Sequence, residues 1–293
     1  MLPSKYITLK NGRNIVNTMS SLYSQQNHKD MILQYLTGRY EGVAVLGFNR
    51  PEQKNALSVN LVRELSKAID KINYENVARV VILRSVVPKI FCAGADLKER
   101  ATMTPKEVAD FVTNIRFVIS KIQNVPVPVL AALDGVAVGG GLEMSLSCDI
   151  RVASEDAKMG LVETKLAIIP GGGGTQRLPR LINPSVAKEL IFTSKIVDGT
   201  AARDLGIVNH VVEQTDKGDG AYQKCLDISE DILSCGPLAT RMAKQAINKG
   251  IEVDLNTGLA IEEACYAQII PTKDRLEGLQ AFKEKRKPKY QGH

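Results

Sequence analysis

The sequence contains no apolar run long enough to cross a membrane. Its best candidate, residues 125–146, is broken by two prolines, Asp134, Glu143 and a glycine triplet, whereas a membrane-spanning helix needs about 18 consecutive apolar residues. The five cysteines include no C-x-x-C pair, and an odd, scattered set is typical of reduced, mostly buried thiols rather than a disulfide scaffold. With 44% hydrophobic residues, the 293-residue chain can build a sizeable globular core, which excludes intrinsic disorder of the whole chain.

Histidine is also scarce, and this limits the chemistry available to the protein. Of the three histidines, His28 and His293 lie in terminal segments. A histidine-based catalytic triad or metal site would therefore depend on His210 alone, and we expect neither.

Acidic residues are absent from the first 29 positions. Lys5, Lys10, Arg13 and Lys29 account for four of the six net positive charges, so the basic character belongs mainly to this segment. The segment is rich in serine and asparagine and has no apolar core, which fits a mitochondrial transit peptide better than a secretory signal. The alternative is a disordered tail without a targeting role. We therefore expect residues 1–36 to be transit peptide and linker, and the protein to be located in the mitochondrial matrix.

Beyond this segment, short apolar runs alternate with amphipathic stretches. Apolar runs predict strands at 43–48, 80–83, 127–133 and 150–153. Helical periodicity is found at 58–73 and 106–123. The alternation predicts an α/β core over residues 37–199. Apart from a strand candidate at 207–212, residues 200–293 are helix-prone and predict a mainly helical C-terminal appendage.

A glycine triplet, Gly139 to Gly141, precedes a predicted helix. Glycines let a ligand approach the backbone closely, and the free N–H groups of a first helical turn favour negative charge. No Gly-Lys-Ser/Thr follows and the G-x-G-x-x-G spacing is absent, so neither a Walker loop nor a dinucleotide-binding loop is indicated. An oxyanion site and simple close packing of the helix on a sheet remain equally open.

Two glutamates accompany the glycine-rich segments. Glu143 lies two residues after the triplet, and Glu163 lies before a Pro-Gly turn. Two carboxylates that converge beside an oxyanion site would suit general acid–base catalysis. The alternative is a Glu143 that only caps its helix and a solvated Glu163, and spacing along the chain does not decide between them.

Four ordered segments resemble the enoyl-CoA hydratase/isomerase (crotonase) family. They are Phe-Cys-Ala-Gly-Ala-Asp-Leu at 91–97, the stretch 130–150, Ile-Pro-Gly-Gly-Gly-Gly-Thr-Gln-Arg-Leu at 169–178, and 282–286. The resemblance covers about residues 40–290 and implies a crotonase-like (ββα)-type spiral core with the helical C-terminal appendage. It also implies homo-oligomers, either trimers or hexamers, whose C-terminal helices complete the pocket. No metal or redox cofactor is implied, because coenzyme A enters as part of an acyl-CoA substrate.

The same resemblance implies roles for individual residues. It places an oxyanion hole on the backbone N–H groups of Ala95 and Gly140, and a water contact on the backbone of Gly171. In the family's hydratases the residue matching Glu163 protonates Cα while the one matching Glu143 helps take a proton from water. Because both glutamates are present, hydration of an enoyl-CoA is favoured over isomerisation, which remains an alternative.

The resemblance also implies contacts with coenzyme A. We expect lysine contacts to its phosphates and an aromatic residue near the acyl tail. The residues expected to bind it are Lys54, Ala93, Ala95, Asp96, Leu97, Lys98, Gly140, Phe282 and Lys285.

Residues 160–170 and 270–278 resemble one branch of the family in particular. That branch hydrates 3-methylglutaconyl-CoA in leucine degradation and is also described as binding AU-rich RNA. The RNA binding is attributed to a row of lysines on one helix, which falls here on Arg63, Lys67 and Lys71, spaced by four. The row is incomplete, so a solvated amphipathic surface is favoured over RNA binding. An RNA-binding protein with a vestigial or secondary hydratase pocket is retained as a second hypothesis.

Overall fold

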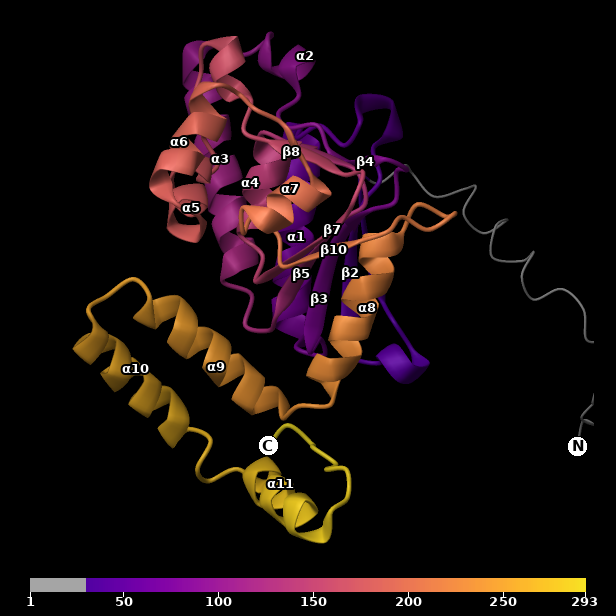
Figure 1. Cartoon of the computed structure of the whole chain (residues 1–293), viewed down its shortest axis with the longest axis vertical. Helices are drawn as coiled ribbons and strands as arrows, with labels where there is room; N and C mark the ends of the chain where they lie inside the picture. The colour runs from indigo at the N-terminus through magenta and orange to yellow at the C-terminus, as the bar shows by residue number, and fades with distance from the viewer. Residues whose placement is uncertain (1–29) are drawn as a thin grey trace, which may run out of the picture.

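The computed structural model describes residues 30–293 (Figure 1). Of residues 1–36, which we predicted to be transit peptide and linker, residues 1–29 therefore lie outside the described part of the chain. The structure describes only the end of this segment, from Asp30 on. That part forms strand β1 (Met31–Tyr35) instead, which pairs antiparallel with β2 (Val43–Phe48). Met31, Leu33 and Tyr35 pack against the core at every second position, as a strand with one covered face requires. The expectation of a linker at 30–36 was therefore wrong.

The main sheet has six strands in the order β1-β2-β3-β5-β7-β10. The other four strands are β3 (Val80–Ser85), β5 (Val129–Leu133), β7 (Ile150–Ser154) and β10 (His210–Val212). All pairings except β1–β2 are parallel. Both faces carry apolar side chains because helices cover both, which explains the unbroken hydrophobic runs in the sequence.

A second sheet of four short strands has the order β4-β6-β8-β9. Its strands are β4 (Ile90–Cys92), β6 (Val136–Val138), β8 (Lys158–Gly160) and β9 (Val197–Asp198). Each of the pairs β3/β4, β5/β6 and β7/β8 gives one strand to each sheet before the chain enters a helical segment. This repeated β-β-α path is the predicted crotonase-like spiral. Since β4, β6 and β8 are parallel, their carboxyl ends meet at one edge.

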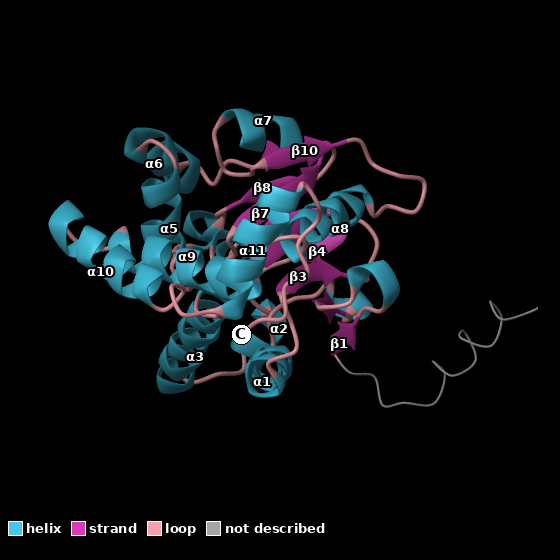
Figure 2. Ribbon diagram, turned by 90° about the horizontal axis from the view of Figure 1, so that it is seen from below, coloured by secondary structure: helices cyan, strands magenta, loops and turns pink. Residues whose placement is uncertain are grey.

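Helices cover the sheets and build the wall of the site. They are α1 (Val59–Glu75), α2 (Leu97–Arg100), α3 (Pro105–Gln123), α4 (Gly140–Leu146), α5 (Gly174–Leu181), α6 (Pro184–Phe192), α7 (Gly199–Asp204) and α8 (Gly220–Leu233). Short 3-10 turns lie at η1 (Gly38–Tyr40), η2 (Pro51–Gln53) and η3 (Glu163–Leu166). The long helices α1 and α3 pack against each other, and Figure 2 shows them on the same side of the molecule. No helix of the described chain is both long and apolar enough to span a membrane.

The core continues beyond residue 199, where the sequence had suggested its end. Strand β10 extends the main sheet beside β7, and α8 covers the face of that sheet opposite α1. The carboxylate of Asp134 accepts hydrogen bonds from the N–H groups of Ala221 and Tyr222 at 2.7 and 3.1 Å, which fixes the start of α8. Only α9 (Pro237–Gly250), α10 (Leu255–Ala267) and α11 (Lys273–Glu284) extend away from the sheets (Figure 1).

Candidate active site

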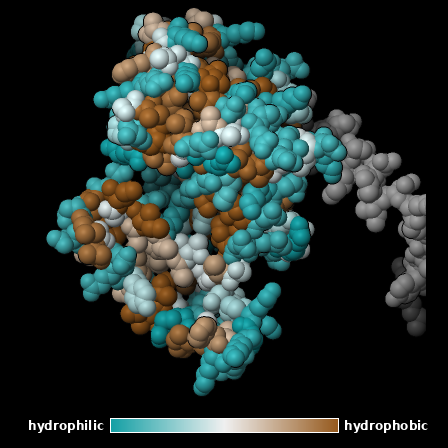
Figure 3. Space-filling view, in the orientation of Figure 1, coloured by the Kyte–Doolittle hydropathy of each residue, from teal (hydrophilic) through white to brown (hydrophobic). Residues whose placement is uncertain are grey.

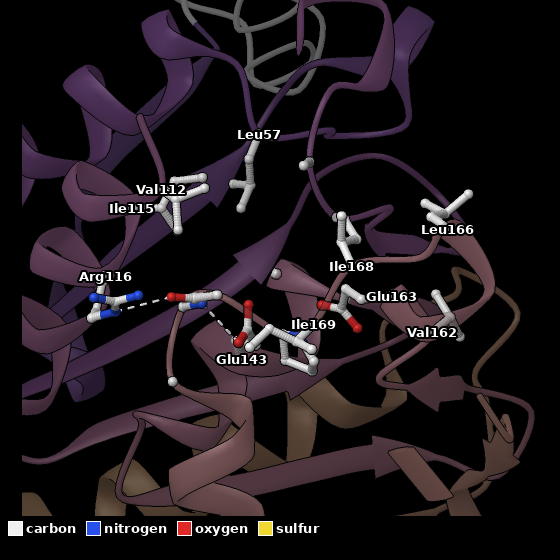
Figure 4. Close-up of a pocket in the computed structure, with 18 of the residues that line it drawn as sticks. Leu57, Val112, Ile115, Arg116, Glu143, Val162, Glu163, Leu166, Ile168 and Ile169 are labelled. Atoms are coloured by element: carbon white, nitrogen blue, oxygen red, sulfur yellow. Dashed lines mark hydrogen bonds between the residues drawn. The ribbon is translucent and has the colours of Figure 1, made fainter. Parts of the chain in front are cut away.

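A cavity of about 800 Å³ opens where the carboxyl ends of β4, β6 and β8 meet. The segments that follow these three strands line it, together with α3 and the loop before α5. Its size is within the range of small-molecule sites. Figure 4 shows the apolar and charged side chains that surround it.

Two backbone N–H groups point to an oxyanion site in this cavity. Ala95 follows β4, and Gly140 is the first residue of α4 after β6. Neither N–H has an acceptor within residues 30–293. The two segments lie side by side, since a Cβ placed on Gly94 would be 3.6 Å from the nitrogen of Gly140. Free amides at the first turn of a helix favour a developing negative charge.

Glu143 is held by the glycine loop before α5. Its Oε1 accepts hydrogen bonds from the N–H groups of Gly172 and Gly174 at 2.8 and 2.7 Å, and Oε2 has no hydrogen-bond donor among residues 30–293. A Cβ on Gly172 would lie 2.8 Å from Oε2, so the loop can wrap the carboxylate only with glycine there. Burial raises the pKa of Glu143, while the two amide hydrogen bonds and the charge of Arg177 oppose the rise.

Glu163 begins η3 and faces the same cavity from the opposite side of Ile169 (Figure 4). Its Oε1 lies close to Gly139, where a Cβ would be 3.2 Å away. Its Oε2 is buried and has no hydrogen-bond partner within residues 30–293. Burial, together with the neighbouring charge of Glu143, raises the pKa of Glu163 from 4.5 to about 7.

The arrangement therefore brings two carboxylates and two free amides to one apolar cavity. The amides can stabilise an oxyanion, and a carboxylic acid with a pKa near 7 can give or take a proton at neutral pH. The alternative in which Glu143 only caps its helix and Glu163 is solvated is not what the geometry shows, because both side chains face the cavity. No group of three histidine, cysteine or acidic residues within 30–293 has the arrangement of a metal site.

Three further residues predicted from the sequence line the cavity, whereas the side chain of Asp96 is used within the protein. Ala93, Leu97 and Gly171 line it. Asp96 is buried beside it, but its carboxylate caps α2 and pairs with Arg50 at 2.8 Å. That carboxylate is engaged within the protein, so any contact of Asp96 with a ligand would have to come from its backbone.

The four other residues that we predicted to contact coenzyme A do not line the cavity. Lys54 and Lys98 are exposed near the segment that follows β4. Phe282, which is 86% exposed, and Lys285 lie at the end of α11, well away from α2 and α3 in Figure 1. The expected contacts of Phe282 and Lys285 with the acyl tail and the phosphates are not available within one chain.

The predicted basic row lies on the exposed face of α1. Arg63 donates to the side chain of Asn60 at 2.7 Å, and Lys71 pairs with Glu75 at 3.6 Å. Lys67 lies between them on the solvent side. The face is thus interrupted by acceptors of its own, as on an ordinary solvated helix.

Sequence reasoning missed the wall of the cavity formed by α3. Val112, Ile115 and Arg116 line it from this helix, as does Leu57 from the loop before α1. The spacing of 112, 115 and 116 places these residues on one helical face, but that face looked like any other core-facing stripe. A lone arginine on it was the one signal that could have been noticed.

Comparison with known proteins shows similarity over nearly all of the described chain. A family model described as enoyl-CoA hydratase/isomerase matches residues 38–293. Methylglutaconyl-CoA hydratase, mitochondrial, of Homo sapiens is 61% identical over 263 residues, which cover 90% of this chain and 78% of that protein. Enoyl-CoA hydratase domain-containing protein 2, mitochondrial, of Mus musculus is 50% identical and covers 89% of this chain and 88% of its own length.

A solved structure has the same fold. The crystal structure of an enoyl-CoA hydratase from Bacillus anthracis superposes with a TM-score of 0.86 at 49% identity, over 90% of this chain and 100% of that one.

Proposed function

The chain belongs to the enoyl-CoA hydratase/isomerase family, and on this basis we propose that it hydrates the α,β double bond of 3-methylglutaconyl-CoA. The observation that carries the reaction type is the pair of buried carboxylates, Glu143 and Glu163, in one cavity with two free amides. The acyl group is supported by the name of the 61% identical human relative. Water addition would place the hydroxyl group on Cβ and give a 3-hydroxyacyl-CoA.

In the proposed reaction the N–H groups of Ala95 and Gly140 hold the thioester oxygen. Negative charge grows on this oxygen as water attacks Cβ, and one donor of this kind is typically worth about 3 kcal/mol. The carboxyl ends of Glu143 and Glu163 hold the attacking water between them. Glu143 takes a proton from the water as its oxygen bonds to Cβ, and Glu163 delivers a proton to Cα.

The differing environments of the two glutamates suit these roles. Glu143 is oriented through Oε1 by two amides, which leaves Oε2 to accept a proton from water. Glu163 has a raised pKa and an oxygen without a partner, so it can hold a proton at neutral pH and deliver it to carbon. The N–H of Gly171, which lines the cavity, remains our candidate for a further contact to the water.

We place the enzyme in the mitochondrial matrix as a homo-oligomer. The location is supported by the names of the relatives, which describe them as mitochondrial proteins, and by the basic composition of residues 1–29. A trimer or hexamer, as the family resemblance implies, would bring C-terminal helices of one copy toward another. No cofactor is needed for this chemistry, since coenzyme A arrives as part of the substrate.

A panel of CoA thioesters tests the proposal directly. Loss of enone-thioester absorbance is followed for 3-methylglutaconyl-CoA, crotonyl-CoA and 2-hexenoyl-CoA under the same conditions, with product identified by mass. We expect a mass increase of one water molecule and the highest kcat/KM with 3-methylglutaconyl-CoA. Rearrangement of a 3-enoyl thioester without uptake of water, and no hydration of any member of the panel, would instead support an isomerase.

A further inference from the structure

Two cationic side chains, Arg100 and Arg116, line a cavity whose other charged groups are the two glutamates. Neither arginine forms an ion pair with an acidic residue within 30–293. The catalytic proposal uses neither of them. An arginine that faces a largely apolar cavity without a counter-ion has its charge available to a ligand.

Arg116 is solvent-exposed at the cavity wall, and its hydrogen bond to Gly171 leaves most of its guanidinium group free. It lies on α3 one turn after Val112 and beside Ile115, both of which line the cavity. Its Nε donates to the carbonyl oxygen of Gly171 at 3.0 Å, and its two terminal nitrogens have no partner within the described chain. Two parallel N–H donors in this geometry match a carboxylate.

One peptide group connects Arg116 to Glu143. The carbonyl of Gly171 accepts from Arg116, and the N–H of Gly172, in the same peptide group, donates to Glu143. With standard bond lengths, this limits the separation of Arg116 Nε and Glu143 Oε1 to no more than about 8 Å. Figure 4 shows Arg116 on the far side of this peptide from Glu143, while Glu163 lies on the other side of Glu143.

We propose that Arg116 binds the terminal carboxylate of a short dicarboxylic enoyl-CoA and thereby selects this class of substrate. The inference rests on the proposed function and adds the residue that recognises the acyl end. In 3-methylglutaconyl-CoA the terminal carboxyl carbon is only two bonds from Cβ, the atom next to which Glu143 acts. The carboxylate must then lie within a few bond lengths of Glu143, and a nearby cation would offset the repulsion between the like charges.

Arg100 is the less suitable partner because of its place in the fold. It ends α2, the helix that begins at Leu97 and follows Ala95, so it stands on the thioester side of the cavity. The acyl end lies beyond the double bond, toward α3 and the glycine loop. Arg116 is the cation on that side.

The test compares selectivity rather than activity alone. In the full-length enzyme, kcat/KM is measured for 3-methylglutaconyl-CoA and for crotonyl-CoA, which has no terminal carboxylate. Arg116→Gln keeps a donor for Gly171 but removes the charge, so we expect the ratio of the two kcat/KM values to fall about fivefold or more. The ratio for Arg116→Lys should lie between those of wild type and Arg116→Gln, because lysine keeps the charge but cannot form the bidentate contact.

Two further variants serve as comparisons. Lys106→Gln makes the same charge change on the same helix outside the cavity, and its ratio should stay within about twofold of wild type. Arg100→Gln should change the ratio much less than Arg116→Gln.

The outcomes separate the two proposals. If Arg116→Gln lowers both kcat/KM values equally, the residue only orients the glycine loop, and our inference is wrong. If the ratio falls more in Arg100→Gln than in Arg116→Gln, Arg100 binds the carboxylate, and our inference is again wrong. Wild-type enzyme that hydrates neither thioester would contradict the proposed function itself, whatever the variants do.

Discussion

The two glutamates of the cavity are fixed in different ways. Glu143 is tied by two amides of the glycine loop, whereas Glu163 has a buried oxygen with no partner. A buried polar atom without a partner costs free energy, and such atoms in native proteins are usually reserved for a ligand, water or substrate. The contrast fits one carboxylate that orients water and one that transfers a proton to carbon.

Replacing either glutamate with glutamine should remove catalysis without removing the fold. Glutamine has almost the same volume, but it neither releases nor accepts the catalytic proton. We expect kcat for hydration to fall about 10²- to 10⁴-fold in Glu143→Gln and in Glu163→Gln. Stopped-flow absorbance measures the rate, and near-UV circular dichroism checks that packing is unchanged. Turnover close to that of wild type in either variant would rule out the assigned roles.

The pH dependence of the reaction follows from the raised pKa of Glu163. The pair works with a single proton, which Glu163 holds for hydration and Glu143 holds for dehydration. Above a pH of about 7, Glu163 is ionised and no longer holds the proton that hydration requires, so kcat/KM should fall about tenfold for each further pH unit.

The equilibrium between enoyl and hydroxyacyl thioester consumes no proton, so forward and reverse kcat/KM must fall together. Progress curves recorded in both directions between pH 5.5 and 9 measure this. A flat profile up to pH 9 would show that Glu163 does not hold the catalytic proton.

At the scale of single residues, the residues of the cavity could be predicted only where they belong to a sequence motif. The glycine-rich segments and the two glutamates could be recognised in the sequence, the resemblance to the family assigned Ala95, Gly140, Glu143 and Glu163, and the structure brings all four to one cavity. Arg116 has no such motif, since its partner Gly171 is 55 positions away in the chain. Contacts of this kind depend on how the elements are placed and cannot be obtained from spacing.

Among the elements, helix α4 depends on its close approach to strand β4. A Cβ at Gly141 would lie 2.5 Å from the carbonyl oxygen of Cys92, and backbone atoms cannot give way as a flexible side chain would. The helix carries both the amide of Gly140 and the carboxylate of Glu143. Close packing, one of the two alternatives that the sequence left open, is therefore shown by the geometry of this glycine triplet, and it is compatible with the oxyanion site that we propose at Gly140.

Gly141→Ala should displace α4 even though alanine is the better helix former. We expect a loss of about 1–3 kcal/mol in the free energy of unfolding, as for other overpacked sites. We also expect kcat to fall by a larger factor than KM rises. Urea denaturation and steady-state kinetics measure the two effects. Gly258→Ala in α10 is a matched control, because its added Cβ would be 3.4 Å from the nearest atom and should not destabilise the protein. Equal stabilities of the two variants would contradict the packing argument.

The long helices and the central strands of the main sheet were predictable from periodicity, because runs covered on both faces and amphipathic stripes are strong signals. The short strands of the second sheet gave no such signal. In the main sheet, β1 was missed, and β10 was found as a strand candidate at 207–212 but was placed outside the core. Strand β1 follows directly on the basic leader, so its alternation over Met31–Tyr35 was assigned to a linker. Strand β10 has only three residues, and its membership of the main sheet depends on pairing with β7, which lies more than fifty positions earlier.

At the scale of the whole molecule, the C-terminal helices leave large apolar side chains uncovered. Ile251, Leu255 and Phe282 are 78%, 75% and 86% exposed, and Figure 3 shows apolar residues gathered over this part of the surface. Soluble monomers rarely expose so much apolar surface in one region. This surface supports the assembly that we propose.

Assembly should therefore depend on α9 to α11. Light scattering is expected to give a mass that is a multiple of the 32.0 kDa chain, corresponding to three or six copies. Leu255→Asp combined with Phe282→Asp should shift the protein toward the monomer, because charges at an apolar interface are strongly unfavourable. Tyr74→Asp, at a 91% exposed position on α1, is the control. A wild-type protein that is monomeric at micromolar concentration would contradict the expectation.

Strand β1 also limits where the transit peptide that we predict could be cleaved. The N–H of Met31 donates to Glu64 at 3.0 Å, and the carbonyl of Asp30 accepts from the N–H of Asn49 at 2.8 Å. A peptidase that cut beyond this point would strip the outer strand and leave the edge of β2 with unsatisfied backbone groups, open to pairing with other chains. We therefore expect cleavage of the predicted transit peptide to leave Asp30 and all that follows it in the mature enzyme, because the hydrogen bonds of the sheet begin at this residue.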